Sequence, residues 1–131
     1  MADEINVWPQ YSATAVSDGG ATETAILTTG GIDTTPQQER VLITGIVSVT
    51  PGTAATAIVV KVRRGSGVSG AEVGSTETQT GAAGTSQVVS FHVEDNPGEV
   101  EGEQYTITVT ETSATAPGTV SVVTCSITTH G

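Results

Sequence analysis

Apolar and polar side chains alternate along this chain in short runs, and the segment from residue 104 to residue 110 shows the rule. Tyr105, Ile107 and Val109 are apolar, and the residues between them are threonine. A β-strand turns successive side chains to opposite faces, so we expect this segment to bury its apolar side chains and to expose its threonines to water. Threonine is β-branched and favours extended backbone, so both faces support a strand.

The same alternation recurs between turns rich in Gly and Pro, and it predicts seven strands. These cover residues 21–28, 40–49, 57–64, 71–78, 86–93, 104–111 and 119–128. Wide loops alternate with tight turns, which favours a jelly roll over an immunoglobulin-like sandwich. We therefore predict an all-β protein with a single jelly-roll-like antiparallel β-sandwich of about eight strands. Residues 1–20 are interpreted as an N-terminal arm that supplies the eighth strand, and residues 21–131 as the sandwich domain.

Two irregularities interrupt the pattern. Gly45 lies inside the most hydrophobic strand and predicts a bulge or a point of close packing. The alternation slips at Val122 and Val123, which predicts a bulge or a segment buried on both faces. The in-phase apolar residues form the predicted core, which consists of Val41, Ile43, Val47, Val60, Val62, Val89, Phe91, Tyr105, Ile107 and Val109.

Charge narrows the range of partners. The chain has 14 acidic and 4 basic residues among 131, for a net charge of −10. Nucleic-acid binding depends on Lys and Arg that neutralise phosphates, so we predict no nucleic-acid partner and no contact with an anionic membrane. Two interpretations of the acidity stay open, a general device for solubility and attraction to a basic surface. No apolar run reaches the length of a membrane span.

Chemistry-bearing residues are few. Cys125 is the single cysteine, in phase with Val123 and Ile127, and we expect a buried small hydrophobe in place of a catalytic thiol. The acidic run at residues 94–103 could offer oxygen ligands to calcium, but its spacing does not match an EF-hand. Neither a catalytic triad nor a phosphate-binding loop nor zinc-ligand spacing is present, and aromatic platforms for sugars are lacking. We therefore predict no enzyme activity, no cofactor and no metal.

The candidate interface residues fall into two groups. Lys61, Arg63 and Arg64 gather three of the four cations on one strand, with Lys61 and Arg63 on one face and Arg64 on the other. They are either a solvated strand end paired with nearby acids or an anchor for a partner. The second group lies in the arm and consists of Trp8, Pro9 and Tyr11.

Two stretches, residues 59–67 and 95–109, resemble jelly-roll capsid decoration (cement) proteins of tailed bacteriophages in their residue types and in the order of their strands. The resemblance implies a structural virion protein that binds the capsid exterior and stabilises the lattice of the major capsid protein. Together with the aromatic-poor core it implies a homotrimer, and it fits an N-terminal arm that reaches a neighbour. The alternatives are a phage tail or receptor-binding module that binds a host-surface glycan and a carbohydrate-binding domain of a secreted enzyme.

The first six residues carry acids where a signal peptide needs positive charge. We therefore expect a protein made in the host cytoplasm that ends on the outside of a capsid.

Overall fold

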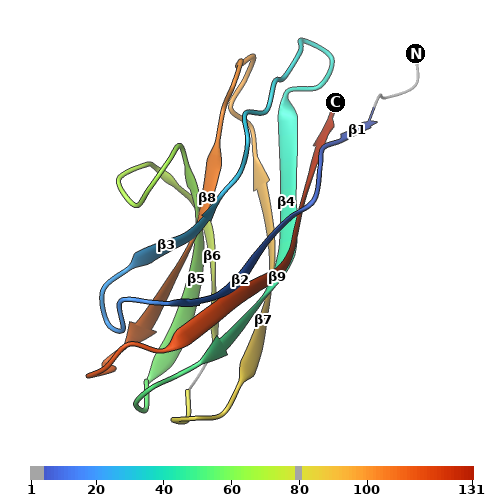
Figure 1. Ribbon diagram of the computed structural model, residues 1–131. Helices are drawn as coiled ribbons and strands as arrows, with labels where there is room; N and C mark the ends of the chain where they lie inside the picture. Colours follow the sequence, from blue (N-terminus) through green and yellow to red (C-terminus); the bar gives the residue numbers. More distant parts are fainter. Residues whose placement is uncertain (1–4, 79–80) are drawn as a thin grey trace.

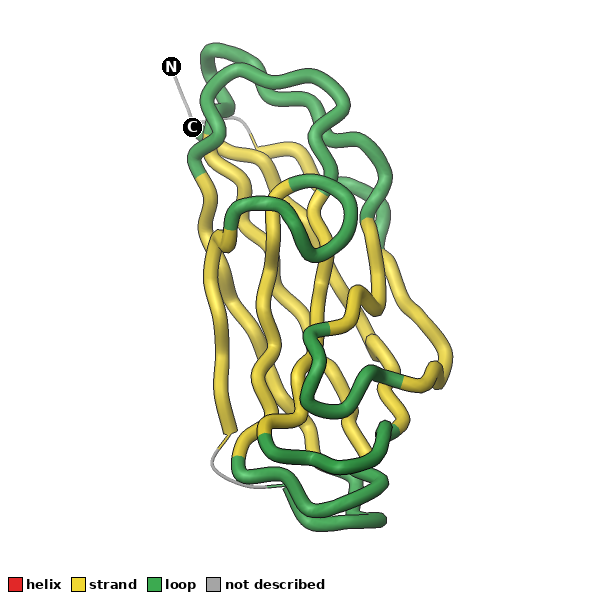
Figure 2. The backbone as a smooth tube through the Cα atoms, turned by 90° about the vertical axis from the view of Figure 1, so that its left-hand side faces the viewer, coloured by secondary structure: helices red, strands yellow, loops and turns green. Residues whose placement is uncertain are grey.

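Two antiparallel sheets pack face to face in the computed structural model, which describes residues 5–78 and 81–131. No helix occurs in this described part of the chain (Figure 2), so the prediction of an all-β sandwich is confirmed. Its nine strands are β1 (Ile5–Val7), β2 (Tyr11–Ser17), β3 (Thr24–Thr28), β4 (Arg40–Thr50), β5 (Ala57–Arg64), β6 (Glu72–Thr78), β7 (Gln87–Asp95), β8 (Tyr105–Thr112) and β9 (Thr119–His130).

The strand order is that of a jelly roll. Sheet A has the order β1-β9-β4-β7, with β2 also paired to β9, and sheet B has the order β3-β8-β5-β6 (Figure 1). Every neighbouring pair is antiparallel, and β5 pairs with β6, β4 with β7, β3 with β8 and β2 with β9. The first half of the chain thus pairs with the second half as one long hairpin, whose tip is the loop between β5 and β6. Rolling this hairpin produces the two sheets.

The N-terminal segment completes sheet A. β1 pairs with the end of β9 through Ile5 and His130, and β2 pairs with the middle of β9 through Tyr11 and Cys125. Between them, the Trp8 amide donates to the Ile127 carbonyl oxygen at 3.0 Å. In the structure this segment is therefore part of the sheet, and the division of the chain into an arm and a domain stays a prediction.

All ten predicted core residues lie in the hydrophobic core between the sheets. The core also takes in Ile32, Val49, Ile58, Val93, Val120, Val122, Cys125 and Ile127. Most of these side chains are β-branched aliphatics, which fill the thin layer between two stacked sheets well. The expectation that Cys125 is a buried small hydrophobe is confirmed, since none of its surface is exposed.

Both irregularities appear where the sequence predicts them. The register between β4 and β9 shifts between Ile46 and Val47, and this shift leaves Val123 as the extra residue of a β-bulge. Gly45 is a point of close packing, because a Cβ atom there would overlap the carbonyl oxygen of Thr124 and the ring of Phe91.

One expectation about the outer face of β8 is wrong. Thr106 and Thr108 are fully buried, although they alternate with the core residues. The loop between β5 and β6 folds back over Thr106, whose hydroxyl donates to the Gly65 carbonyl oxygen at 2.7 Å. The Thr108 hydroxyl donates to Glu23 at 2.6 Å. Threonine tolerates burial here because both hydroxyls find acceptors.

Candidate interaction surface

All four basic residues of the chain form ion pairs with acids of the same chain. The pairs are Arg40 with Glu94, Lys61 with Glu72, Arg63 with Glu23 and Arg64 with Asp95. The three cations proposed from the sequence as anchors therefore already have carboxylate partners within the molecule. Their role in binding a partner stays a prediction.

Arg63 and Glu23 form a two-pronged ion pair on the outer face of sheet B. The Arg63 Nε atom donates to Glu23 Oε2 at 2.6 Å, and one terminal nitrogen donates to Oε1 at 2.8 Å. The other terminal nitrogen of Arg63 donates to the Gly70 carbonyl oxygen at 2.8 Å. These contacts hold the β5–β6 loop and the start of β3 against β8. The Arg63 guanidinium is the main reason that the pKa of Glu23 falls to about 2 from its ordinary 4.5.

We expect Glu23 to make stability depend on acid pH. Its pKa is lower in the folded chain, so its stabilisation is complete above about pH 4.5 and is lost as pH falls towards about 2. The Glu23→Gln variant should lose about 2 kcal/mol of unfolding free energy at neutral pH. It should also lose this part of the acid dependence. Denaturant unfolding at several pH values measures both, with Glu77→Gln on the exposed side of β6 as the control. An unchanged acid slope in Glu23→Gln would contradict the assignment.

Arg64 points the other way and joins the two sheets. Its Nε and one terminal nitrogen donate to the two carboxylate oxygens of Asp95 at 3.0 and 2.6 Å. The Tyr105 hydroxyl donates to Asp95 Oδ2 at 2.7 Å. Asp95 belongs to β7 of sheet A, whereas Arg64 and Tyr105 belong to β5 and β8 of sheet B. Burial and the neighbouring Asp95 carboxylate both raise the pKa of Tyr105, so its hydroxyl remains a donor.

The candidate residues of the N-terminal segment lie on a different sheet from the cations. Trp8 and Tyr11 are partly buried and pack against the core, and the Trp8 indole donates to the Thr129 hydroxyl at 3.2 Å. Pro9 is exposed. Lys61 lies on β5 in sheet B, so the structure does not bring the two candidate groups into one patch.

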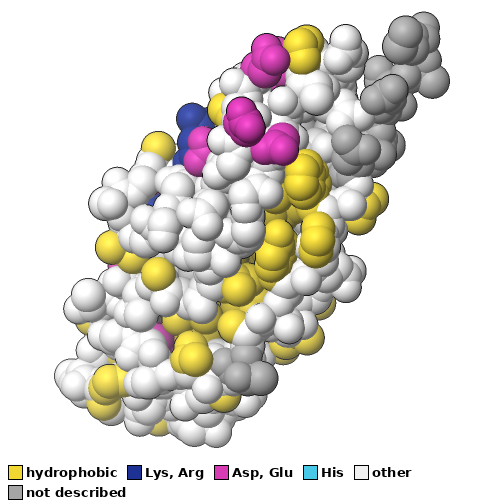
Figure 3. Space-filling view, turned by 45° about the horizontal axis from the view of Figure 1, so that its top comes forward, with side chains coloured by type: hydrophobic (Ala, Val, Ile, Leu, Met, Phe, Trp, Pro, Cys, Tyr) yellow, Lys and Arg dark blue, Asp and Glu magenta, His cyan; other side chains and the backbone are white. Residues whose placement is uncertain are grey.

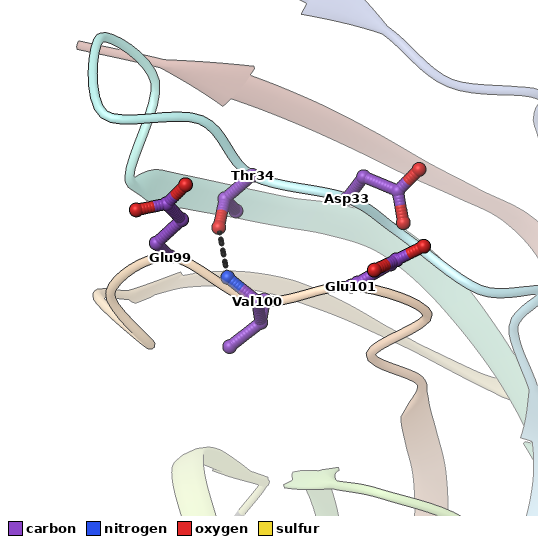
Figure 4. A pocket seen from close by; sticks show the side chains of 5 residues that line it. All are labelled: Asp33, Thr34, Glu99, Val100 and Glu101. Atoms are coloured by element: carbon purple, nitrogen blue, oxygen red, sulfur yellow. Dashed lines mark hydrogen bonds between the residues drawn. The ribbon is translucent and has the colours of Figure 1, made fainter.

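The acidic run from residue 94 to residue 103 divides between several environments. Asp95 is buried, whereas Glu94 pairs with Arg40. Glu99 and Glu101 line an open hollow of about 440 Å³ with Asp33, Thr34 and Val100 (Figure 4). In Figure 4 the carboxylates of Asp33 and Glu101 lie on one side and that of Glu99 on the other. Among the described residues, no group of three or more His, Cys, Asp or Glu side chains could hold a metal ion.

The outer face of sheet A carries little charge, and it was not among the candidates drawn from the sequence. Val88 on β7 and Val123 on β9 are 64% and 57% exposed, and they lie on either side of β4. Ile46 and Ser48 lie between them on β4, and the charged groups of this face gather at its far end, around Glu94. We call Ile46, Ser48, Val88 and Val123 the valine face. Figure 3 shows the molecule in another view, in which acidic side chains gather near one end and apolar side chains form a strip below them.

Comparisons with known proteins show the fold and no family. No family model and no curated protein matches the chain. A structure of Bacillus endospore appendages, described as disulfide-linked pili, matches with 20% identity and a TM-score of 0.50, over 98% of this chain and 90% of that one. A structure of the infectious bursal disease virus Gx strain and one of an infectious bursal disease virus VP2 subviral particle match with 13% and 12% identity. Their TM-scores are 0.56 and 0.53, over 96% and 98% of this chain.

The lengths of these matches differ. This chain spans about a third of each viral protein, 32% and 33%, so the likeness is to one part of a larger chain. It spans nearly all of the pilus subunit. No described helix is long and apolar enough to cross a membrane. The jelly roll is thus shared with proteins of two kinds of large assembly.

Proposed function

We propose that this chain is a structural, non-enzymatic protein that binds the outer surface of a phage capsid and stabilises its lattice. The observation that carries the proposal is the valine face, an uncharged surface on a chain of net charge −10. The central parts of protein interfaces are depleted of charge, so an acidic protein is expected to approach another protein through such a face. The shared fold with viral capsid proteins supports a role in a virion.

The polar chemistry of the described residues supports binding over catalysis. The four cations are paired internally, and the Cys125 thiol is buried, which raises its pKa to about 11 and keeps it protonated. A decoration protein needs many modest contacts that repeat over a lattice, and multivalent attachment raises its occupancy without new chemistry. We keep Trp8, Pro9 and Tyr11 as further contact candidates, and a homotrimer as the expected state.

A second candidate is a subunit of a protein filament. It is favoured by the match to the endospore appendage structure, which covers nearly the whole of both chains. That structure is described as disulfide-linked, and Cys125 of this chain has no exposed surface. A filament of this chain would therefore assemble through non-covalent contacts of the folded domain.

The Val88→Glu/Val123→Glu variant tests the proposed function. It places two carboxylates on the valine face, and we expect it to weaken binding to capsids at least tenfold, roughly the effect of losing a central interface contact. Val68→Glu is the matched control, because Val68 is 44% exposed in the β5–β6 loop, away from sheet A. The measurement is co-sedimentation of the purified chain with phage particles that lack it, with circular dichroism to check the fold.

The outcomes separate the candidates. Equal weakening by both variants would contradict the valine face as the contact, since any added charge would then act alike. The filament would be favoured if the unmodified chain does not bind particles but forms polymers whose size in sedimentation rises with concentration. The double variant should then form no such polymers. Binding to a host-surface glycan in place of particles would favour a receptor-binding module.

A further inference from the structure

Two carboxyl groups meet inside the protein at the end of the sandwich opposite the acidic hollow. Asp18 directly follows β2 and is 4% exposed, and Glu111 on β8 is fully buried. Glu111 is in phase with Ile107 and Val109, so it points into the space between the sheets. A buried carboxylate is costly unless donors or cations compensate its charge.

The well-formed hydrogen bonds of this pair are made by Asp18. Asp18 Oδ1 accepts from the amides of Gly20 and Gly118 at 2.8 and 2.9 Å. Asp18 Oδ2 and both carboxyl oxygens of Glu111 are buried and have no hydrogen-bond partner among the described groups. Gly118 makes room for the pair, because a Cβ atom there would overlap Glu111 Oε2. Three buried acceptors without a donor imply that one oxygen carries a proton.

We propose that Asp18 and Glu111 share one proton and together form a pH-operated latch between the β2–β3 turn and the β8–β9 connection. Because the amides of Gly20 and Gly118 both donate to Asp18, we place the shared proton on Glu111, which donates it to Asp18. When Glu111 loses this proton to a base in solution, two anions face each other, and the Gly118 amide, which already donates to Asp18, cannot compensate both charges. The turn at residues 18–22, which is also held by the Glu111 amide on the Gly20 carbonyl oxygen at 2.7 Å, then separates from β8.

Among the described residues, the segments around the pair supply no unpaired cation that could replace the proton, and Glu23, which follows the 18–22 turn, is paired with Arg63. Residues 50–57, 81–86 and 112–119, which form the neighbouring turns and strand ends, contain no titratable residue. The four cations of the chain are paired with other acids. Burial is the main cause that raises the pKa of Glu111 to about 8 from its ordinary 4.5. The hydrogen bond with Asp18 and the charge of Asp18 raise this pKa further, and the nearby Gly118 amide lowers it.

The raised pKa of Glu111 in the folded chain determines how stability changes with pH. Between about pH 4.5 and 8 the folded chain binds one proton more than the unfolded chain, so stability falls as pH rises through this window and levels off above it. We expect the constant for opening the β2–β3 turn to rise about tenfold per pH unit across the window. Hydrogen exchange at the amides of Gly20 and Gly118, corrected for the intrinsic effect of pH, measures this opening.

The matched variants are Glu111→Gln and Asp18→Asn in the full chain. Glu111→Gln removes the titrating group, so we expect the tenfold-per-unit dependence to disappear in this variant. In Asp18→Asn burial still raises the pKa of Glu111, so we expect the dependence to persist over a narrower pH window. Glu77→Gln on the exposed side of β6 should keep it. A pH slope that persists unchanged in Glu111→Gln would overturn the proposal.

Two measurements on the unmodified chain keep the proposal testable if the variants fail to fold. Infrared spectroscopy at neutral pH should detect the carbonyl band of one protonated carboxylic acid, which disappears above about pH 8. Absence of this band at neutral pH would refute the shared proton. Millimolar calcium at pH 9 should leave the exchange rates unchanged, whereas restored protection would show a cation site in place of a proton.

Discussion

The Asp95→Ala variant is expected to lose about 3 kcal/mol of unfolding free energy, which corresponds to about 10 °C in melting temperature. Removal of the carboxylate leaves the Tyr105 hydroxyl buried without an acceptor and leaves Arg64 without its counter-ion. Arg64 is partly exposed, with 38% of its side-chain surface accessible, so water recovers part of its cost. Most of the loss comes from the link between the sheets, since Asp95 accepts from two strands of sheet B.

Glu94→Ala is the matched control, because Glu94 is adjacent to Asp95 and also pairs with an arginine. Its pair with Arg40 is longer, at 3.8 Å, and both side chains are about half exposed. We expect a change within about 0.5 kcal/mol. Chemical denaturation of both variants at pH 7 measures the difference. Similar losses in the two variants would show that Asp95 does not act as a link between the sheets.

Most of the fold could be predicted because a strand has a period of two residues. A run such as Ser86–Val93 shows its inner face directly, and for that reason the ten predicted core residues are all buried. The N-terminal segment could not be placed in the same way. Its two strands are separated by the residues around Pro9, and their partner β9 lies at the far end of the chain. Pairing over such a distance leaves no local pattern.

The candidate site was harder to predict, because alternation separates two faces without showing what covers each. Thr106 lies on an outer face by phase, yet a loop from elsewhere in the chain buries it. Asp95 and Glu111 carried a usable signal. Each continues the phase of buried apolar residues, Val93 before Asp95 and Val109 before Glu111, which places a carboxyl on an inner face. An acid in an apolar phase is a candidate for an internal ion pair or a shifted pKa.

The valine face depends on which strands become neighbours. Val88 and Val123 are 35 residues apart in the sequence, and only the order β9-β4-β7 places them on one surface. The bulge that exposes Val123 could be predicted from the slip in alternation, but its place beside Ile46 required the register of β4 and β9. A sequence of strands indicates a jelly roll, whereas a surface made by three of them requires the pairing.

Gly45→Ala is expected to destabilise the chain by about 3 kcal/mol, although it adds a single methyl group. Gly45 lies in the middle of β4, between β7 and β9, and faces the core beside Phe91. The new Cβ atom would overlap the Phe91 ring and the carbonyl oxygen of Thr124. The ring can be displaced at the expense of core packing, but the carbonyl belongs to the β-bulge and moves only with the backbone of β9. The reduced entropy of the unfolded chain returns at most about 1 kcal/mol.

Two further variants separate the causes of this loss. Gly45→Ala/Phe91→Leu removes the ring that the new Cβ atom would overlap, so the double variant should lose less stability than the sum of the losses in the two single variants. A double-mutant cycle measures this difference as the coupling between the two positions. Gly30→Ala is the control, because a Cβ atom there meets only the Tyr11 hydroxyl, at 3.2 Å. We expect it to change the unfolding free energy by less than about 1 kcal/mol. If Gly45→Ala unfolds at the same denaturant concentration as Gly30→Ala, the bulge of β9 yields to the methyl group, and close packing at Gly45 does not stabilise sheet A.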